Sequence, residues 1–554
     1  MVAWIAALAA LLLSPIRRAG YLLGHDMVFT PRQPLDLASI GLSSASPRAV
    51  PLDALVAIAE RVADGALVGR VAVVAPVFAA GLGVAVLLSS RSLPARLAAG
   101  GFAVWNAYFV ERMALGQWAL LWAYAALPWI VLAVNRGRGR GGWFARALAI
   151  AAASITPTGG LIATASAVTV SAVGGNGRRE TLRVAALAVA LQLPWVVAAV
   201  VSPAAATSDP AAVAAFAARA EHSGGVALSL LTGGGIWDSE VVPGSRAGVL
   251  AWLTLAALIA AAVFGWRRLS ELLGARLLAA LTGLAAAGVV VALASSVPGG
   301  DAVMRSVVAH VPGAGLLRDS QKWIMPLVLL EALLVGADVD RIAAAVHARH
   351  VRVLVGIAAA CLPILLLPDA AATMRPTFEP VHYPRDWSAV VAAARRGDAA
   401  VLPFESYRLF AWAPGRSVLD PAPRLIAVPA VVDDRLAVAG KVLRGEDTRA
   451  RQVDAALTAA GKRGTGLAAG LARLGVTWVI LEHGTPGPVP DFGELVPVHI
   501  GTDVSLYRVP GPHQNPAVQT WRVVGLVAAD ALAVLVVLGA GVAAVRRSTI
   551  GPRT

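Results

Sequence analysis

Charged and titratable side chains gather in the segment that follows the first apolar run of this 554-residue chain. The stretch YLLGHDMVFTPRQPLD, residues 21–36, holds His25, Asp26, Arg32 and Asp36. A carboxylate or an imidazole can accept a proton from a reacting group, and a guanidinium can bind an anion. Only 14% of the residues in the chain are charged, so this concentration of ionisable groups marks a candidate functional site.

A second polar segment interrupts an apolar and aromatic run at residues 104–131. It contains Asn106, Glu111, Arg112 and Gln117, followed by Trp118. The flanking apolar runs leave room for only a short turn, so we expect these groups to lie near membrane depth. Polar groups at that depth are costly unless they face a cavity or one another. The aromatic residues form either an interfacial belt or the lining of a cleft for a lipid chain or a sugar.

Two further segments bring ionisable groups together. Residues 202–246 include Glu221 and His222, and the stretch VPGAGLLRDSQKWIMP, residues 311–326, carries Arg318, Asp319 and Lys322. Arg318 and Lys322 lie one helical turn apart, so they can clamp a phosphate as a fork and a point charge. Ordinary charges at a helix end are the alternative interpretation.

The elements that must position these groups are predicted to be membrane helices. Hydrophobic residues make up 57% of the chain, a balance that is foreign to soluble globular domains. The single Cys361 excludes a disulfide framework. A span needs about 20 apolar residues, and we predict about twelve spans, several of them short. They cover residues 2–23, 71–88, 97–109, 118–134, 145–155, 161–173, 184–201, 249–264, 277–294, 323–339, 353–367 and 523–545.

Arginines recur between the predicted spans and predict the orientation. The clusters are Arg91 and Arg96; Arg136, Arg138, Arg140 and Arg146; Arg178, Arg179 and Arg183; Arg267, Arg268 and Arg276; Arg341, Arg349 and Arg352; and Arg546 and Arg547. They fall on alternate loops, which the positive-inside rule places in the cytoplasm together with both termini. We therefore expect a multi-pass protein of the plasma membrane whose four polar segments face outward. The net charge of +14 does not indicate nucleic acid, because the arginines form no single patch.

Arg17 and Arg18 do not fit this alternation, since they interrupt the first apolar run near its outer end. Snorkelling to the interface is one interpretation, and a phosphate-binding pair inside the bundle is the other.

Residues 368–520 differ in composition and contain no run long enough to span a membrane. Alternating strand and helix patterns predict an extracytoplasmic α/β domain between a multi-span domain, residues 1–367, and a last span with a short tail, residues 521–554. The segment DVSLYRVPG reads as a closing edge strand. We expect the polar residues of this domain to form a solvated surface, with sugar binding as the alternative. These residues are Glu405, Arg408, Asp420, Glu446 and Asp447.

Together the motifs GYLLGHD, NAYFVERMALGQWALLWAYAALPW and LLRDSQKW resemble GT-C type membrane glycosyltransferases. The likeness extends over residues 20–340 and is greatest to actinobacterial, including mycobacterial, arabinofuranosyltransferases. It implies a GT-C-like fold and a polyprenyl-phosphate sugar as donor, carrying arabinofuranose or mannose. It also implies a general base in the first outer loop, a role that falls on Asp26 by position, with Asp36 second. The implied acceptor is a cell-wall polysaccharide or a glycolipid.

On this interpretation Glu111 assists catalysis, and the substrate and its phosphate bind to a set of polar and aromatic residues. These are His25, Arg32, Arg112, Gln117, Trp118, Arg318, Asp319 and Lys322. No spacing of metal ligands is convincing, so no metal site is predicted. Two other classes remain open: a transporter or flippase for a lipid-linked or other amphiphilic substrate, for which related halves would be expected, and a non-catalytic envelope assembly protein.

Overall fold

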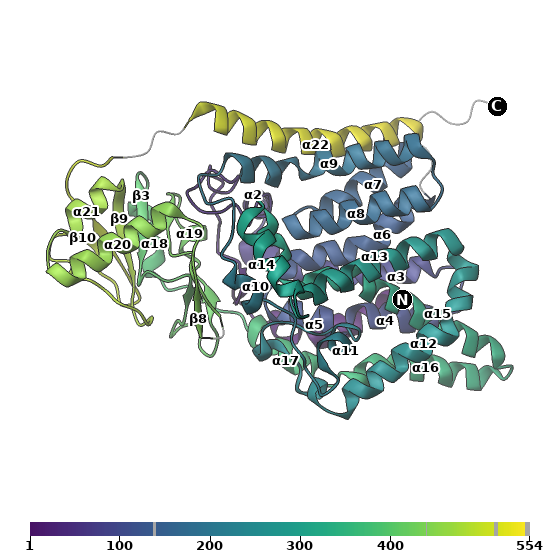
Figure 1. Ribbon diagram of the computed structural model, residues 1–554. Coiled ribbons are helices and arrows are strands. Elements are labelled where there is room, and N and C mark those ends of the chain that lie inside the picture. Colours follow the sequence, from purple (N-terminus) through teal and green to yellow (C-terminus); the bar gives the residue numbers. More distant parts are fainter. Residues whose placement is uncertain (137–139, 439, 515–518, 549–554) are drawn as a thin grey trace.

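The computed structural model describes residues 1–136, 140–438, 440–514 and 519–548. A helical bundle and a smaller α/β unit lie end to end (Figure 1). Within the described residues, seven helices are long and apolar enough to cross a membrane. They are α3 (Gly65–Leu87), α6 (Trp118–Arg136), α9 (Arg178–Val201), α12 (Val249–Leu273), α13 (Ala275–Ala294), α16 (Arg349–Leu366) and α22 (Thr520–Ser548). Their length and composition are those of a polytopic helical membrane protein.

The other predicted spans also fall on helices, but these are shorter or more charged. They are α1 (Val2–Leu12), α4 (Leu93–Val104), α7 (Arg140–Ala153), α8 (Pro157–Val173) and α15 (Met325–Ala345). The predicted first span, residues 2–23, is wrong in its second half: α1 ends at Leu12 and a 3₁₀ turn follows over Ser14–Arg17. Pro15 lacks the N–H that would continue an α-helix. The count of twelve spans stays a prediction.

The predicted span 97–109 is likewise divided. The helix α4 ends at Val104, and a separate helix α5 (Ala107–Ala114) begins after Asn106, whose side chain accepts a hydrogen bond from the Phe109 N–H at 2.9 Å. This is an N-cap, which starts a new helix by satisfying one of its first free N–H groups. The break places Glu111 and Arg112 on a short helix of their own.

Several arginine-rich loops meet at the end of the bundle away from the α/β unit (Figure 1). Arg91 and Arg268 both pair with Asp340, at 3.6 and 3.0 Å, and Arg146 pairs with Glu180 at 2.5 Å. Loops that are far apart in sequence therefore share one end, as the predicted orientation requires, and the side of the membrane that they face stays a prediction. Arg138 and the side chains of Arg136, Arg140, Arg546 and Arg547 lie outside the described residues.

The α/β unit is built on a five-stranded sheet. Its order is β10 (Val496–His499), β11 (Val504–Arg508), β9 (Val476–Glu482), β3 (Asp398–Leu402) and β6 (Ala430–Val431). The strand β3 runs parallel to β6 and β9, and β11 runs antiparallel to β9 and β10. The prediction that the segment DVSLYRVPG forms an edge strand is wrong, because β10 pairs along its outer side and becomes the edge.

Helices cover both faces of this sheet. On one face α20 (Thr448–Arg463) and α21 (Leu467–Arg473) contribute Val453 and Leu471 to a core with Ala400. On the other face α18 (Asp386–Ala393) and α19 (Ala422–Leu425) contribute Trp387 and Leu425 to a core with Ala399. Successive residues of a strand point to opposite faces, which is why Ala399 and Ala400 belong to different cores.

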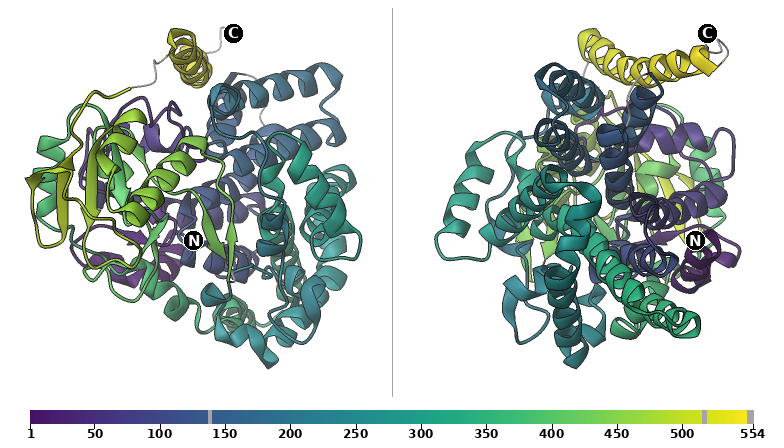
Figure 2. Two further views of the ribbon diagram at one scale, coloured as in Figure 1. Left: turned by 60° about the vertical axis from the view of Figure 1, so that its left-hand side comes forward. Right: turned by 90° about the vertical axis from the view of Figure 1, so that its right-hand side faces the viewer.

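Two small hairpins join the bundle to the α/β unit. The first is β1 (Leu23–Gly24) with β2 (Met27–Val28), and the second is β4 (Tyr407–Arg408) with β5 (Val418–Leu419). A shared apolar cluster holds them together. It includes Leu23, Val28, Val381, Phe410 and Val418. The helix α17 (Ala370–Phe378) packs against α1 and α5 beside this junction. Figure 2 shows α22 at the periphery of the bundle, where it packs against α7 and α9.

The segment between the first two predicted spans, residues 24–70, contains a buried carboxyl group, Glu60, at the end of α2 (Leu52–Ala59). Its Oε2 accepts a hydrogen bond from the Gln33 N–H, and the residue is 1% exposed. Burial raises the pKa of Glu60 to about 7, with a further increase from Asp64 that the Gln33 N–H and Arg32 oppose. The folded protein therefore keeps the Glu60 proton to a higher pH than the unfolded chain does.

The contribution of Glu60 to the free energy of unfolding should consequently fall as the pH rises from about 4.5 to about 7, because over that range the unfolded chain releases the proton first. We expect Glu60→Gln to raise the apparent unfolding midpoint at pH 8, by an amount equivalent to roughly 1 kcal/mol. At pH 4 the difference should vanish, since both side chains are then neutral. Thermal unfolding in detergent at the two pH values measures this, with Glu240→Gln, on an exposed turn, as control. Equal gains at both pH values would contradict the explanation.

Candidate functional site

Asp26 lies at the tip of the β1–β2 hairpin, next to His25 in the left-handed backbone region at φ +47°. The tip packs onto the turn between α5 and α6, where the Asp26 N–H donates to the Leu115 carbonyl at 3.2 Å. Gly116 makes this approach feasible: it has φ +77°, and a Cβ there would lie 2.5 Å from the Gly24 carbonyl oxygen and 3.0 Å from the Asp26 nitrogen. A side chain at position 116 would therefore push the Asp26 hairpin away.

A continuous polar network starts at the Asp26 carboxylate. The Gln117 amide donates to Asp26 Oδ2 at 3.0 Å, and the Tyr407 hydroxyl donates to Oδ1. Arg112 donates to Gln117 Oε1 at 2.8 Å and forms a bidentate pair with Asp319, at 2.8 and 2.7 Å. The network thus joins the first hairpin, the α5–α6 turn, the segment before α15 and the α/β unit.

The members of this network differ in how deeply their side chains are buried. The side chain of Arg112 is 0% exposed and that of Asp319 is 10% exposed, whereas Lys322, 3.2 Å from Asp319, is 23% exposed. Burial alone would raise the pKa of Asp319, but the cations of Arg112 and Lys322 outweigh it and hold the pKa well below its usual range. The half-buried Asp26, Gln117 and Lys322 are therefore the members that a substrate could reach, and the Arg112–Asp319 pair supports them from behind.

Arg318 points to a different set of partners from its neighbour Asp319. Its guanidinium lies 3.6 Å from Glu446 and over the ring of Phe216, 5.2 Å from the centroid. Glu446 also pairs with Arg48 at 3.1 Å and accepts from Ser208 at 2.6 Å. Burial, together with the nearby Arg48, lowers the pKa of Arg318 to about 10. Arg318 therefore ties the α/β unit to the bundle beside the network and does not form a clamp with Lys322.

Besides Arg318 and Glu111, four predicted site residues lie outside the network. Asp36 binds within its own turn, where its carboxylate accepts from the Ser39 N–H at 2.9 Å. Arg32 is exposed, and Trp118 packs against Phe29 with ring centroids 5.1 Å apart. His25 contacts the β4–β5 hairpin through its backbone, which pairs with Ser417 and Leu419 at 3.2 and 2.8 Å.

Arg17 and Arg18 lie on the surface rather than inside the bundle. The side chain of Arg18 is 62% exposed and pairs with Glu379, and the Arg17 side chain is also exposed. This placement does not support a phosphate-binding pair in the bundle.

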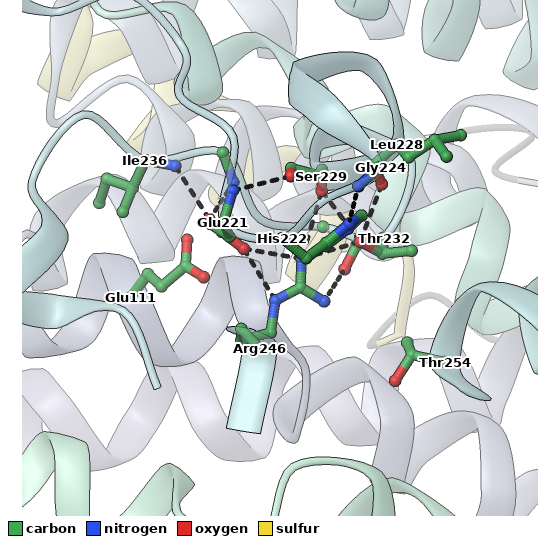
Figure 3. Close-up of polar contacts among 12 residues, drawn as sticks. Glu111, Glu221, His222, Gly224, Leu228, Ser229, Thr232, Ile236, Arg246 and Thr254 are labelled. Carbon is green, nitrogen blue, oxygen red and sulfur yellow. Dashed lines mark hydrogen bonds and ion pairs between the residues drawn. The ribbon is translucent and has the colours of Figure 1, made fainter. Parts of the chain in front are cut away.

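A second buried cluster, centred on Glu221 and Arg246, lies beside Glu111 (Figure 3). Arg246 donates to Glu221 Oε2 at 2.8 Å and to Thr232 Oγ1 at 2.8 Å. Glu221 also accepts from the N–H groups of Gly235 and Ile236. A Cβ at Gly234 would lie 2.0 Å from Glu221 Oε2, so the glycine-rich turn after α11 (Gly225–Leu230) is what allows the cluster to close.

Glu111 leaves α5 in a different direction from Arg112 because neighbouring helical residues diverge by about 100°. It accepts a hydrogen bond from Gln321 at 2.5 Å and is 0% exposed. Burial, together with the Glu221 carboxylate, raises the pKa of Glu111 well above its ordinary value, and Arg246 only partly opposes this. A neutral Glu111 behind the network fits a supporting role better than that of a base that reaches substrate.

The sequence analysis missed Tyr407 in the network, Arg246 in the second cluster and Gln321 as the partner of Glu111. Nothing in the stretch FESYRLF separates Tyr407 from an ordinary strand residue. The expected solvated surface on the α/β unit is also wrong for most of its residues: Arg408, Asp420, Glu446 and Asp447 are buried, at 1, 2, 7 and 2% exposure. Charged residues can be buried when they are paired, and a pairing partner across the fold is invisible in the local pattern.

Among the described residues, no group of three or more His, Cys, Asp or Glu side chains is placed to hold a metal ion. Comparison of the chain with protein-family models, with curated proteins and with solved structures found no match. Inferences about function therefore rest on the residues and their geometry.

The Arg112–Asp319 pair should be essential for the stability of this end of the bundle. Arg112→Met leaves a buried carboxylate with Lys322 alone, and removing one partner of a buried pair costs about 3–5 kcal/mol. Adding Asp319→Asn should recover part of this loss, so that the double variant is more stable than the sum of the single effects predicts. Denaturant unfolding of the four proteins measures the coupling.

The exposed pair Arg305–Asp301 is a matched control, with side chains 44 and 38% exposed. Arg305→Met should change stability by less than about 1 kcal/mol. Additive effects at Arg112 and Asp319, or an equal loss at Arg305, would refute the role assigned to the buried pair.

Proposed function

We propose that this protein is a membrane glycosyltransferase that transfers a sugar from a polyprenyl-phosphate donor to an envelope glycan or glycolipid. The observation that carries the proposal is the network in which the half-buried Asp26 is joined through Gln117, Arg112 and Asp319 to the cation of Lys322. A proton acceptor and a cation that are linked by one polar network, at the end of a membrane-helix bundle, suit attack by a hydroxyl on a phosphate-linked sugar.

In the proposed reaction Asp26 is the general base. The acceptor oxygen forms a bond to the anomeric carbon as its proton passes to the Asp26 carboxylate. The bond between that carbon and the phosphate oxygen breaks, and its electron pair stays on the departing polyprenyl phosphate. The products are the glycoside, the polyprenyl phosphate and protonated Asp26, which returns its proton to water. General-base assistance of this kind accelerates a reaction by roughly 10²–10⁴-fold.

The leaving phosphate gains negative charge, so a cation beside it stabilises the transition state. Lys322 is the candidate, because its side chain is 23% exposed and shares Asp319 with Arg112, whereas Arg112 is fully buried and Arg318 pairs with Glu446. The donor lipid would extend from this site along the apolar helices. The extracytoplasmic location of the site, with both termini in the cytoplasm, is part of the proposal and follows from the arginine-rich loops at the opposite end.

The identity of the sugar, arabinofuranose or mannose, follows only from the resemblance to arabinofuranosyltransferases. A transporter or flippase remains the second hypothesis, and an envelope assembly protein the third. These two classes need no proton acceptor at Asp26, so the chemistry of this side chain separates the three.

We predict that Asp26→Asn abolishes one envelope linkage, because an amide cannot take the proton of the acceptor hydroxyl. The measurement compares lipid and cell-wall glycans of a deletion strain complemented with the wild type, with D26N or with D36N. The D36N strain should make the linkage, since the Asp36 carboxylate is bound within its own turn. Equal protein levels are established by immunoblotting of membranes.

Unchanged envelope glycans in the D26N strain would rule out the enzyme. A deletion strain in which the lipid-linked sugar accumulates unused supports transfer, whereas accumulation of that donor on the inner leaflet alone would favour a flippase.

A further inference from the structure

The α/β unit reaches into the Asp26 site through one side chain. The hydroxyl of Tyr407, the first residue of β4, donates to Asp26 Oδ1, while Gln117 donates to Oδ2. These two donors come from different parts of the fold, one from the α/β unit and one from the bundle. Tyr407 is half-buried and lies 381 residues from Asp26 in the sequence.

The backbone on both sides of Tyr407 is firmly held. The Ser406 hydroxyl binds the carbonyls of Asp433 and Arg435, both at 2.6 Å. Arg408, 1% exposed, pairs with Asp420 at 2.9 Å and with Glu482 at 2.7 Å. A side chain that is anchored by buried contacts on either side has little freedom to leave its partner.

The hairpin that carries Tyr407 also forms backbone hydrogen bonds with the hairpin that carries Asp26. The backbone of His25 accepts from the Leu419 N–H at 2.8 Å and donates to the Ser417 carbonyl at 3.2 Å. Leu419 is the strand partner of Tyr407. The register between the two hairpins is therefore fixed by backbone bonds, and the Tyr407 hydroxyl reaches Asp26 as a consequence of that register.

The charges around this pair come from several elements. Arg112 lies behind Gln117, Arg48 belongs to the segment between the first two predicted spans, and Asp238 caps the 3₁₀ turn Ser239–Val241. Burial, followed by the charge of Asp26, raises the pKa of the Tyr407 phenol well above its ordinary value. The phenol therefore keeps its proton and acts as a donor.

We propose that Tyr407 is a positioning residue of the Asp26 site, through which the α/β unit completes the catalytic centre. A carboxylate offers about four lone-pair positions, so donors from Tyr407 and Gln117 fix its plane while free positions remain for an acceptor hydroxyl. Holding a reacting group at a defined angle is a large part of catalysis. This inference rests on the proposed function for its kinetic consequence, but the contact itself can be tested without any activity.

The contact is tested by incorporating 3-fluorotyrosine at position 407 of the full-length protein in detergent and recording its ¹⁹F NMR signal. We expect Asp26→Asn to move this resonance, because the phenol then faces a neutral amide in place of a carboxylate. Tyr383 provides a matched control, since it lies at the same junction but donates to the Phe29 carbonyl at 3.1 Å. A 3-fluorotyrosine at position 383 should show an unchanged resonance in D26N.

The kinetic consequence is tested with Tyr407→Phe, which removes only the hydroxyl. We expect kcat for sugar transfer to fall about 10- to 100-fold, the effect of losing one hydrogen bond to a charged group, with KM for the donor nearly unchanged. Tyr383→Phe should keep the wild-type kcat. If Y407F does not fold, 3,5-difluorotyrosine at position 407 retains the ring and the hydroxyl, and its stronger donor should alter kcat instead.

The NMR test and the kinetic test together distinguish a failure of the positioning role from a failure of the proposed function. An unmoved ¹⁹F resonance at position 407 in D26N, or a full kcat in folded Y407F, overturns the positioning role. If the wild type transfers no sugar, the proposed function fails, while a shifted resonance at position 407 alone still supports the link between the α/β unit and Asp26.

Discussion

The structure of this protein depends on the cost of burying a charge. Arg112 is completely enclosed, and a guanidinium in such a place is tolerated only when it is paired and hydrogen-bonded. One partner is near in the sequence, Gln117 in the next turn, and the other is distant, Asp319 in a segment 207 residues away. Satisfying this one cation therefore determines how the α5–α6 turn meets the start of α15, and the alignment of Gln117 with Asp26 follows.

A second constraint is steric and acts where the segments converge. The hairpin that carries Asp26 can approach the α5–α6 turn only because Gly116 has no side chain, and the Glu221–Arg246 cluster can close only because Gly234 has none. Glycine at these two positions allows the close contact, although it also makes the backbone of the unfolded chain more flexible. Around them the junction is made of backbone bonds and small apolar clusters, which hold the α/β unit against the bundle.

The sequence predicted the helical membrane class, the segments that carry polar groups and an α/β unit in which the strand DVSLYRVPG coincides with β11. Each of these depends on composition or periodicity within a short window of the sequence. The prediction from sequence failed where a proline or a helix cap interrupts a long apolar run. Pro15 ends the first helix early, and the cap at Asn106 divides the predicted span 97–109. The sequence predicted an edge strand over residues 504–508, but β10 pairs with them. This pairing depends on how the chain folds and leaves no mark in the local pattern of these residues.

By itself, then, the sequence determined which residues favour lipid, which segments are polar and that Asp26, Gln117, Arg112, Asp319 and Lys322 were candidates. These are properties of single residues and their near neighbours, and hydropathy and charge express them directly. Only the tertiary structure decided that these five form one network, that Arg318 belongs to Glu446 instead, and that Tyr407 joins from the α/β unit. The physical reason is that hydrogen bonds and buried ion pairs act over a few ångströms, between groups that the chain separates by up to 381 residues.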